Sequence, residues 1–338
     1  MNFKIHTHFP DGLASDWNRL LDESVTHVPF LRFEYLNAWW QTRGGGEWPQ
    51  AQLMLVTAHD QEQLMGIAPL FLAKNRQGQE AILLVGSIEI SDYLDLIVRA
   101  EHLQSFTGEL LPFLAKAVSH PWQVLDLYNV LDSSPTLAAL EKSAVELGWS
   151  FRQEALQHSP YIPLPGDWET YLEGIDKKQR HEIRRKMRRF ESAEVPTRWM
   201  MTQDAATLDE DIQTFLHLME QDDDKKAFLT PSMREHMALA TRCAFEQGCL
   251  HLTFLEIDGE KAAGYLSFDY LNRLWIYNSG IDWRFSEYSP GWVLLGYLLK
   301  WANENQRTEF DFMRGDEQYK YRFGAIDRFV MRAVVTRP

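Results

Sequence analysis

The residues best suited to chemistry lie near the end of the chain, in the segment 311–324 (DFMRGDEQYKYRFG). This segment combines carboxylates, cations and tyrosines at the end of a predicted buried strand, 308–313. Ligands of open α/β sheets collect beyond the carboxyl ends of strands, and charged groups crowded there can act as acid or base. Surface ion pairs on a terminal loop explain the residues equally well. The candidates are Asp311, Arg314, Asp316, Tyr319 and Lys320.

A second candidate is the loop 284–291 (RFSEYSPG), which precedes a predicted helix at 292–303. A helix N-terminus presents free amides and a positive dipole end, which suit phosphate. We expect Ser289 to act as the N-cap, and Pro290 and Gly291 suit a first turn. A capped helix start without a ligand is the simpler explanation of these residues. Their position between two strands favours a phosphate loop.

The segment 177–190 (KKQRHEIRRKMRRF) is strongly basic, with eight Lys or Arg among its fourteen residues. Ile183, Met187 and Phe190 recur at helical spacing and predict an apolar stripe that docks the helix. The cations beside it could hold an anionic acceptor, a donor phosphate, RNA or a membrane surface. A solvated charged helix is the alternative. The basic stripe consists of Lys177, Arg180, Arg184 and Arg188.

Other polar groups give weaker signals. Asp92 lies in SDYLD near a predicted strand end, where a turn aspartate is the simpler explanation. The run 222–226 (DDDKK) is predicted to be a solvated loop. Cys243 and Cys249 are expected to be reduced thiols. The sequence has no zinc spacing, Walker loop, GxSxG or dinucleotide-binding GxGxxG motif.

Length and composition limit the possible classes of protein. The chain has 338 residues, of which 45% are hydrophobic and 24% charged, as in a globular protein of two domains. A net charge of −14 argues against a general binder of nucleic acid or anionic membranes. No signal peptide and no stretch long enough to span a bilayer is recognised. These features predict a cytoplasmic protein.

The predicted elements repeat once. The first half reads as strands 52–58, 64–72, 81–85 and 93–98, a helix 102–118 and a buried strand 122–128. The second half reads as strands 249–257, 261–270 and 273–281, the helix 292–303 and the strand 308–313, after a helical stretch at 167–190. This repetition predicts tandem domains at 1–160 and 161–338. Two unrelated α+β domains are the alternative.

At this point the sequence resembles a known family. The segments SDYLDL, KKQRHEIRRKMRR, DGEKAAGYLSF, YSPGWVLLGYLLKWA and DFMRGDEQYKYRFG resemble the GNAT acyltransferases. They are most similar to the double-GNAT bacterial acetyltransferases associated with cellulose and exopolysaccharide biosynthesis, which are related to Fem-type aminoacyltransferases. The resemblance implies an α/β (α+β) fold with two tandem GNAT-like domains. Each would be a mixed, mostly antiparallel twisted sheet flanked by helices.

The resemblance also implies an activity. An acyl group would pass from acetyl-CoA or another acyl-CoA, without a metal, to an amine on a small molecule, glycan or peptide. Asp316 would be the base, Tyr319 or Tyr321 the acid, and Lys320 would bind substrate charge. The donor would contact Tyr277, Asn278, Arg284, Tyr288, Ser289, Pro290 and Gly291, and the acceptor Asp92, Arg180, Arg184, Asp311 and Arg314. The first half would be a scaffold that lends a wall to the acceptor site.

One motif departs from the family pattern. The GNAT phosphate loop [Q/R]xxGx[G/A] is incomplete, because the stretch from Arg284 has one glycine, Gly291. Aminoacyl-tRNA or a longer acyl carrier therefore stays open as the donor, as in a Fem-like aminoacyltransferase. A non-catalytic GNAT pair that acts as a binding protein is the third alternative.

Overall fold

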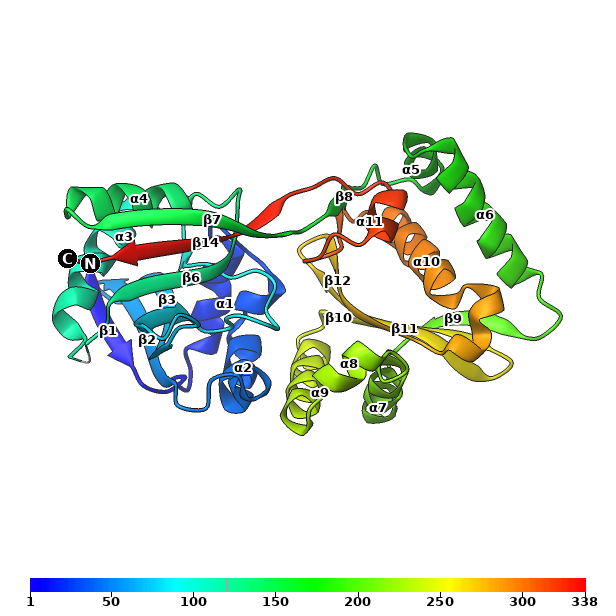
Figure 1. Cartoon of the computed structure of the whole chain (residues 1–338), viewed down its shortest axis with the longest axis horizontal. Helices are drawn as coiled ribbons and strands as arrows, with labels where there is room; N and C mark the ends of the chain where they lie inside the picture. Colours follow the sequence, from blue (N-terminus) through cyan, green and yellow to red (C-terminus); the bar gives the residue numbers. More distant parts are fainter. Residues whose placement is uncertain (120) are drawn as a thin grey trace. The chain divides into compact units, whose positions relative to one another are not determined.

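Two mixed sheets organise the computed structural model, which describes residues 1–119 and 121–338 (Figure 1). The chain divides into a first unit of residues 1–157 and 329–338 and a second unit of residues 158–328. Helices flank the sheet of each unit, which confirms the predicted fold class. No helix within these described ranges has the length and apolar character that a membrane crossing requires.

The first unit is built on a sheet in the order β1-β2-β3-β4-β6-β14-β7, with β5 added to β3. In this sheet β4 and β6 run parallel, while the pairs β1–β2, β2–β3, β3–β4 and β6–β14 are antiparallel. The strands are β1 (Asn2–His6), β2 (Gln52–Asp60), β3 (Gln63–Lys74), β4 (Glu80–Leu84), β5 (Ile97–Val98), β6 (Val124–Leu131), β7 (Ser150–His158) and β14 (Phe329–Thr336). The α-helices are α1 (Ala14–Asp22), α2 (Phe33–Gly46), α3 (Leu103–Ala117) and α4 (Thr136–Glu146).

The final strand corrects the predicted division of the chain. The sequence assigned residues 161–338 to one domain, but the last ten residues belong to the first unit. In that unit β14 lies between β6 and β7, with Val330 opposite Leu131 and Thr336 opposite Val124. Every residue of β6 is buried, so its backbone needs a partner on both edges. The C-terminal strand supplies one of them.

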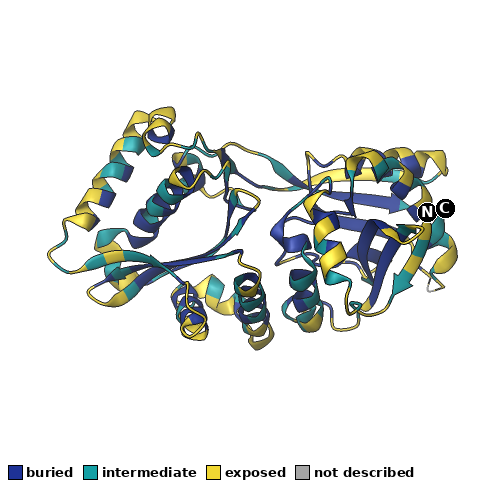
Figure 2. Ribbon diagram, turned by 180° about the vertical axis from the view of Figure 1, so that it is seen from behind, coloured by how far each residue is buried: buried dark blue, intermediate teal, exposed yellow. Residues whose placement is uncertain are grey.

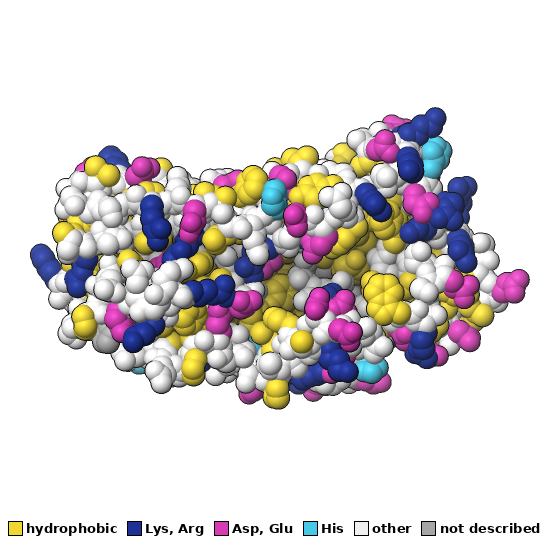
Figure 3. Space-filling model, in the orientation of Figure 1, with side chains coloured by type: hydrophobic (Ala, Val, Ile, Leu, Met, Phe, Trp, Pro, Cys, Tyr) yellow, Lys and Arg dark blue, Asp and Glu magenta, His cyan; other side chains and the backbone are white. Residues whose placement is uncertain are grey.

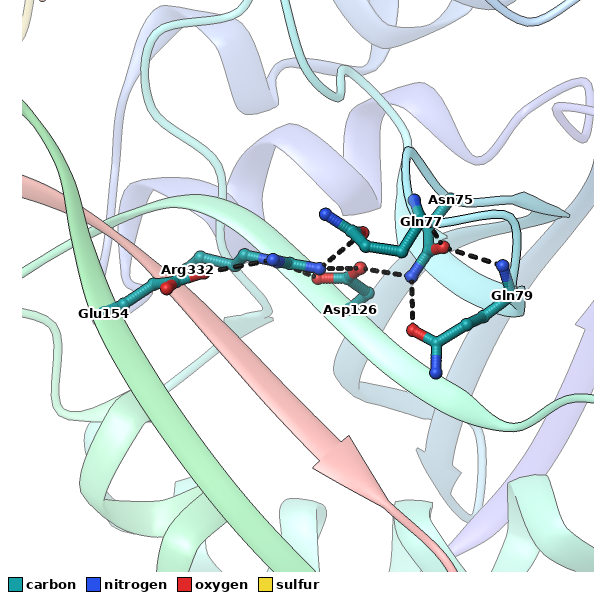
Figure 4. Close-up of polar contacts among 6 residues, drawn as sticks. All are labelled: Asn75, Gln77, Gln79, Asp126, Glu154 and Arg332. Carbon is teal, nitrogen blue, oxygen red and sulfur yellow. Dashed lines mark hydrogen bonds and ion pairs between the residues drawn. The ribbon is translucent and has the colours of Figure 1, made fainter.

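A buried polar network fixes β14 in this sheet (Figure 4). The Arg332 guanidinium donates hydrogen bonds of 2.8 Å to both carboxylate oxygens of Asp126 on β6. It also donates to Glu154 on β7, at 3.0 Å, and to the side chain of Gln77, at 2.8 Å. Asn75 donates to the same Asp126 carboxylate at 2.9 Å. A buried charge pair of this kind is stable because the remaining polar atoms also have partners.

The second unit has a sheet in the order β8-β13-β12-β11-β10-β9. In this sheet β12 and β13 run parallel, and the other neighbouring strands run antiparallel. Helix α10 packs on one face and α7 on the other (Figure 1). The strands are β8 (Tyr161–Pro163), β9 (Thr197–Met201), β10 (Leu250–Ile257), β11 (Glu260–Tyr270), β12 (Arg273–Ile281) and β13 (Glu309–Asp311). The α-helices are α5 (Trp168–Gly174), α6 (Lys177–Glu191), α7 (Leu208–Met219), α8 (Asp223–Phe228), α9 (Pro231–Glu246), α10 (Pro290–Glu304) and α11 (Gln318–Arg322).

The basic helix α6 docks as its sequence predicts. Ile183, Met187 and Phe190 are buried, while most of its cations are exposed (Figure 2). The stripe packs on α10 beside Gly296, where an added Cβ would lie 3.0 Å from the Met187 sulfur. Asp176 caps the helix by accepting from the amides of residues 178 and 179. This cap divides the predicted helical stretch 167–190 into α5 and α6.

The predicted strand 93–98 is the main local error. Only Ile97–Val98 pairs, and residues 86–95 form a mostly buried loop. Its carbonyl groups are satisfied by side chains rather than by a ladder. Trp48 donates to the Ser87 carbonyl at 2.6 Å, and Asn129 donates to those of Ile88 and Ser91 at 2.8 Å. The strand prediction is therefore wrong for residues 93–96 and correct for Ile97–Val98.

Candidate active site

The central feature of the second unit is a strand that loses its neighbour. Trp275 of β12 and Asp311 of β13 form the last pair between these parallel strands. On the other side, Leu266 of β11 faces Asn278 while the next residue of β11 faces Ile276. Tyr277 is therefore the extra residue of a β-bulge, which bends the strand. From residue 276 onward β12 pairs with β11 alone and has a free edge.

Side chains of the chain itself cover part of this free edge. The Ser279 amide donates to the Asn278 side-chain oxygen at 2.8 Å. The Ser279 carbonyl accepts from the Lys225 ammonium at 2.5 Å, and its hydroxyl lies 3.3 Å from the same nitrogen. Lys225 stands on α8, a helix that Asp222 caps. Burial lowers the pKa of Lys225, while Asp222 and Glu317 act in the opposite direction.

The loop after β13 is held by a lysine. Lys320 is 2% exposed, and its ammonium donates to the carbonyl oxygens of Arg314 and Gly315 at 2.8 and 3.1 Å. It also forms an ion pair of 2.8 Å with Glu317. Gly315 has a φ of 111°, a backbone conformation that favours glycine. The Lys320 side chain therefore stabilises the conformation of this loop.

Two tyrosines complete the site. The Tyr265 hydroxyl donates to the Gly291 carbonyl at 3.4 Å, and burial raises the pKa of Tyr265. Burial also raises the pKa of Tyr319, with further contributions from Tyr265 and Glu317. Both phenols therefore stay protonated at neutral pH and can donate hydrogen bonds. We call the group Lys225, Tyr265, Ser279, Glu317 and Tyr319 the β12 cluster.

The two neighbouring carboxylates of this loop face different partners. Glu317 interacts with Lys225, Lys320 and Tyr319. Asp316 is exposed and acts on Tyr321, whose pKa is raised to about 12 by burial, by its bond to Asp327 and by Asp316. Glu317 therefore belongs to the β12 cluster, whereas the partner of Asp316 is Tyr321.

The predicted donor loop has an unexpected geometry. Ser289 occupies the N-cap position of α10 but has a φ of 53° and makes no side-chain cap bond, contrary to our expectation. Tyr288 is half-buried against the core of this unit. Pro290 opens the helix, and a Cβ added to Gly291 would lie 2.4 Å from the Ile281 side chain. Gly291 therefore allows α10 to begin directly against β12.

The guanidinium of Arg284 is already paired with two carboxylates of the chain itself. This guanidinium donates two hydrogen bonds, of 2.9 and 2.7 Å, to one carboxylate oxygen of Asp282, a longer one of 3.2 Å to the other oxygen, and one of 2.6 Å to Glu260. These two carboxylates raise the pKa of Arg284. Donor phosphate would have to compete with both of them for this cation. Tyr277, predicted to contact the donor, packs edge-on against Phe268, with ring centres 5.7 Å apart.

The residues of the second unit that were predicted to bind the acceptor each have different partners within the chain. Asp311 is fully buried, pairs with Arg328 and accepts the Met313 amide at 2.8 Å, which is a structural role. Arg184 pairs with Glu169, and Arg180 donates to the Leu172 carbonyl at 3.4 Å. Arg314 is half-buried and holds Lys320 through its carbonyl group. Asp92 is a buried residue of the first unit.

A basic groove of about 550 Å³ lies between α6, the first turn of α10 and the end of α11. Lys186 stands 4.5 Å from the centre of the Trp292 ring, a favourable cation–π contact. Figure 3 shows Lys and Arg side chains gathered over α6. The groove is lined by Lys178, Gln179, His181, Glu182, Arg185, Lys186, Trp292 and Arg322.

Sequence reasoning missed four members of the β12 cluster: Lys225, Tyr265, Ser279 and Glu317. The segment 222–226 was predicted to be a solvated loop, which is wrong for Lys225 because it reaches β12. A usable signal was Asp222, which could have been recognised as an N-cap. Glu317 lay inside the chosen segment beside Asp316. For Tyr265 and Ser279 the sequence holds no separate signal.

Comparisons with known proteins agree with the fold of the chain. Residues 177–321 match the family model described as an acetyltransferase (GNAT) domain. The solved structure of FemX is similar over 98% of this chain and 97% of its own, with a TM-score of 0.69 and 12% identity.

Two further solved structures resemble the chain. A tandem GNAT protein from the clavulanic acid biosynthesis pathway is similar over 100% of this chain and 99% of its own, with a TM-score of 0.53 and 14% identity. L-PGS from Bacillus licheniformis is similar over 98% and 93%, with a TM-score of 0.56 and 14% identity. A search of curated protein sequences found no match. At these identities the likeness concerns the fold.

Proposed function

Because the chain carries a GNAT acetyltransferase domain and shares its fold with a tandem GNAT protein and FemX, we propose that it is an N-acyltransferase. The acyl group comes from acyl-CoA, with acetyl-CoA the first donor to test, and the acceptor is an amine. The observation that carries this proposal is the free edge of β12 beyond Tyr277, which is followed by a 3-10 helix (Trp283–Tyr288) and then by the N-terminus of α10. An extended thioester can lie along such an edge, and its phosphates can meet free helix amides.

The chemistry needs two proton transfers. The acceptor ammonium gives one proton to a base, and its amine attacks the thioester carbonyl; when the C–S bond breaks, the nitrogen loses its second proton and the departing thiolate takes one up. Tyr319 is our candidate acid, since its phenol stays protonated. Asp316 is the base that the family resemblance implies, and Glu317 is the carboxylate that belongs to the β12 cluster. Lys320 positions the loop that carries both.

In this proposal the first unit is a scaffold. In the first unit, β4 is followed by the buried loop 86–95. In the second unit, the corresponding strand β12 is followed by the loop that leads to α10. Amino sugars are the first acceptors to test, because the sequence resembles acetyltransferases associated with exopolysaccharides. We include peptides and small amines in the same screen.

The proposal is tested by following product formation by mass spectrometry with acetyl-CoA, a long-chain acyl-CoA and a panel of amines. Thermal unfolding with each donor reports binding, since a ligand at 100 times its Kd adds about 2.7 kcal/mol of stability. Gly291→Leu pushes α10 from β12 and should abolish donor stabilisation. Gly174→Leu is the control, because no atom lies within 4 Å of its added Cβ. Absence of both transfer and donor binding would leave a non-catalytic binding protein.

A second candidate is a Fem-like transfer of an aminoacyl group from tRNA. The basic groove favours it, because four Lys or Arg residues and one histidine line a space beside the first turn of α10. The incomplete phosphate loop at 284–291 agrees with this alternative. Its test is binding of aminoacyl-tRNA at several salt concentrations, with Arg185→Ala and Arg322→Ala expected to weaken binding and reduce its salt dependence. Salt-independent binding, or none, contradicts it.

A further inference from the structure

The Lys225 side chain competes for the same backbone groups that the proposed donor needs. In an antiparallel pair, the amide and carbonyl groups of one residue point to the same edge of the strand. At Ser279 both groups have partners from the chain itself: Asn278 accepts from the amide and Lys225 donates to the carbonyl. We refer to these two side chains as the edge cap.

The lysine is held in place from two directions. The capping aspartate of α8, Asp222, and the loop carboxylate Glu317 both interact with it electrostatically. Its neighbour Lys226, on the same helix, is exposed. Tyr265 lies opposite Ser279 on β11 and reaches the start of α10 through the Gly291 carbonyl. The edge cap therefore stands between the bulge at Tyr277 and the first turn of α10.

We propose that Lys225 and Asn278 determine donor specificity by capping the free edge of β12 at Ser279. This inference rests on the proposed position of the donor along that strand. A pantetheine arm has two amides and must displace both cap bonds to pair with Ser279. An aminoacyl ester has no extended amide chain, so it enters the site with the cap in place.

The edge cap makes a directional prediction for the affinity of pantetheine compounds. Lys225→Met keeps the unbranched length but removes the donor, so the Ser279 carbonyl becomes free. A hydrogen bond from a charged group contributes about 1.5–3 kcal/mol, and each 1.4 kcal/mol corresponds to tenfold in Kd. We expect Lys225→Met to bind S-acetylpantetheine on the order of tenfold more tightly than the wild type. Asn278→Ala should tighten binding about threefold.

The matched control is Lys226→Met, which removes the same charge from the same helix and should leave the Kd within twofold. S-acetylpantetheine is uncharged, so its Kd does not include the general effect of protein charge on the phosphates of CoA. Affinities are measured by NMR titration of the full chain, after thermal unfolding has shown that each variant folds. If Lys225→Met does not fold, Asn278→Ala still tests the cap through the amide.

Three results overturn the proposal. Equal affinity of Lys225→Met, Asn278→Ala and Lys226→Met shows that Ser279 is not the pairing site, and weaker binding by Lys225→Met shows that the lysine contacts the donor. Loss of all pantetheine binding in every variant also overturns it. Acyl transfer is scored separately by product formation. If acyl transfer is observed but the cap variants do not change the Kd of S-acetylpantetheine, this inference alone is rejected. If the cap variants bind S-acetylpantetheine more tightly but no acyl transfer is observed, the proposed activity alone is rejected.

Discussion

Arg332 and Asp126 stand 206 residues apart in the sequence, yet their side chains form two hydrogen bonds of 2.8 Å inside the first unit (Figure 4). This pair joins the end of the chain to the centre of the first sheet. The first sheet is therefore completed by a strand that follows the whole second unit in the sequence.

Replacing Arg332 should destabilise the first unit strongly. Arg332→Met leaves the Asp126 carboxylate buried without its cation, which costs about 3–5 kcal/mol when one partner of a buried pair is removed. Arg337→Met is the control, because that cation lies over the Trp122 ring near the end of the chain. Chemical denaturation monitored by tryptophan fluorescence measures both. Equal midpoints for the two variants would contradict a structural role for the buried pair.

The sequence predicts the hairpin of the second unit well, because its signals are local. Strands were expected at 249–257 and 261–270 and are found at Leu250–Ile257 and Glu260–Tyr270. Asp258 and Gly259 adopt φ values of 50° and 79°, as a two-residue hairpin turn requires. Alternating apolar residues and one turn dipeptide were enough to place this element.

The sequence does not predict β14 or the edge cap, because tertiary packing determines both. Residues 329–336 could pair with any exposed strand edge, and local pattern does not identify β6 as the partner. Lys225 and Lys226 are the same residue type at neighbouring positions, but only Lys225 points to Ser279. The direction depends on how α8 lies against β12.

Lys320 should be essential for the shape of the active-site loop. Lys320→Met removes its bonds to two backbone carbonyls and to Glu317, and a bond from a charged donor contributes roughly 1.5–3 kcal/mol. We expect the stability of the second unit to fall by at least that amount and kcat to fall at least tenfold. Lys300→Met, which removes only a surface pair with Glu304, should change neither. Unfolding curves and transfer rates test this, and an unchanged kcat would show that the loop needs no such support.

Two buried histidines should make the protein sensitive to mild acid. Burial lowers the pKa of His236 and His251 from 6.5 to about 4. Between these values the unfolded chain binds more protons than the folded chain, so the free energy of unfolding falls as the pH falls from 6.5 to 4. Each histidine accounts for up to about 3 kcal/mol of that loss. Above pH 6.5 their contribution is constant.

Substituting one of these histidines should flatten the dependence of stability on pH. His251→Leu removes one titrating group, so its free energy of unfolding should change less between pH 6.5 and 4 than that of the wild type. His217→Asn, at an exposed site on α7, should leave the slope unchanged. Urea unfolding at a series of pH values provides the comparison. Parallel curves for His251→Leu and the wild type would mean that His251 is not buried as a neutral group.

The two loop carboxylates should differ in their effect on catalysis. Glu317 acts electrostatically on Lys225 and Tyr319 of the β12 cluster, while Asp316 acts on Tyr321. If a carboxylate of this cluster accepts the proton of the acceptor amine, Glu317→Gln should lower kcat by about 10²–10⁴-fold, the usual range for a general base. Asp316→Asn should lower it by less than tenfold. Both substitutions preserve size, so a steric effect does not complicate the comparison.

The dependence of kcat on pH separates a base from a residue that only positions the loop. Loss of a general base removes the rising acid limb of the profile, whereas a disordered loop lowers kcat equally at every pH. Rates measured from pH 5 to pH 9 for the wild type, Glu317→Gln and Asp316→Asn distinguish these cases. A normal profile in Glu317→Gln together with a lost acid limb in Asp316→Asn would return the role of base to Asp316, the residue that the family resemblance implies.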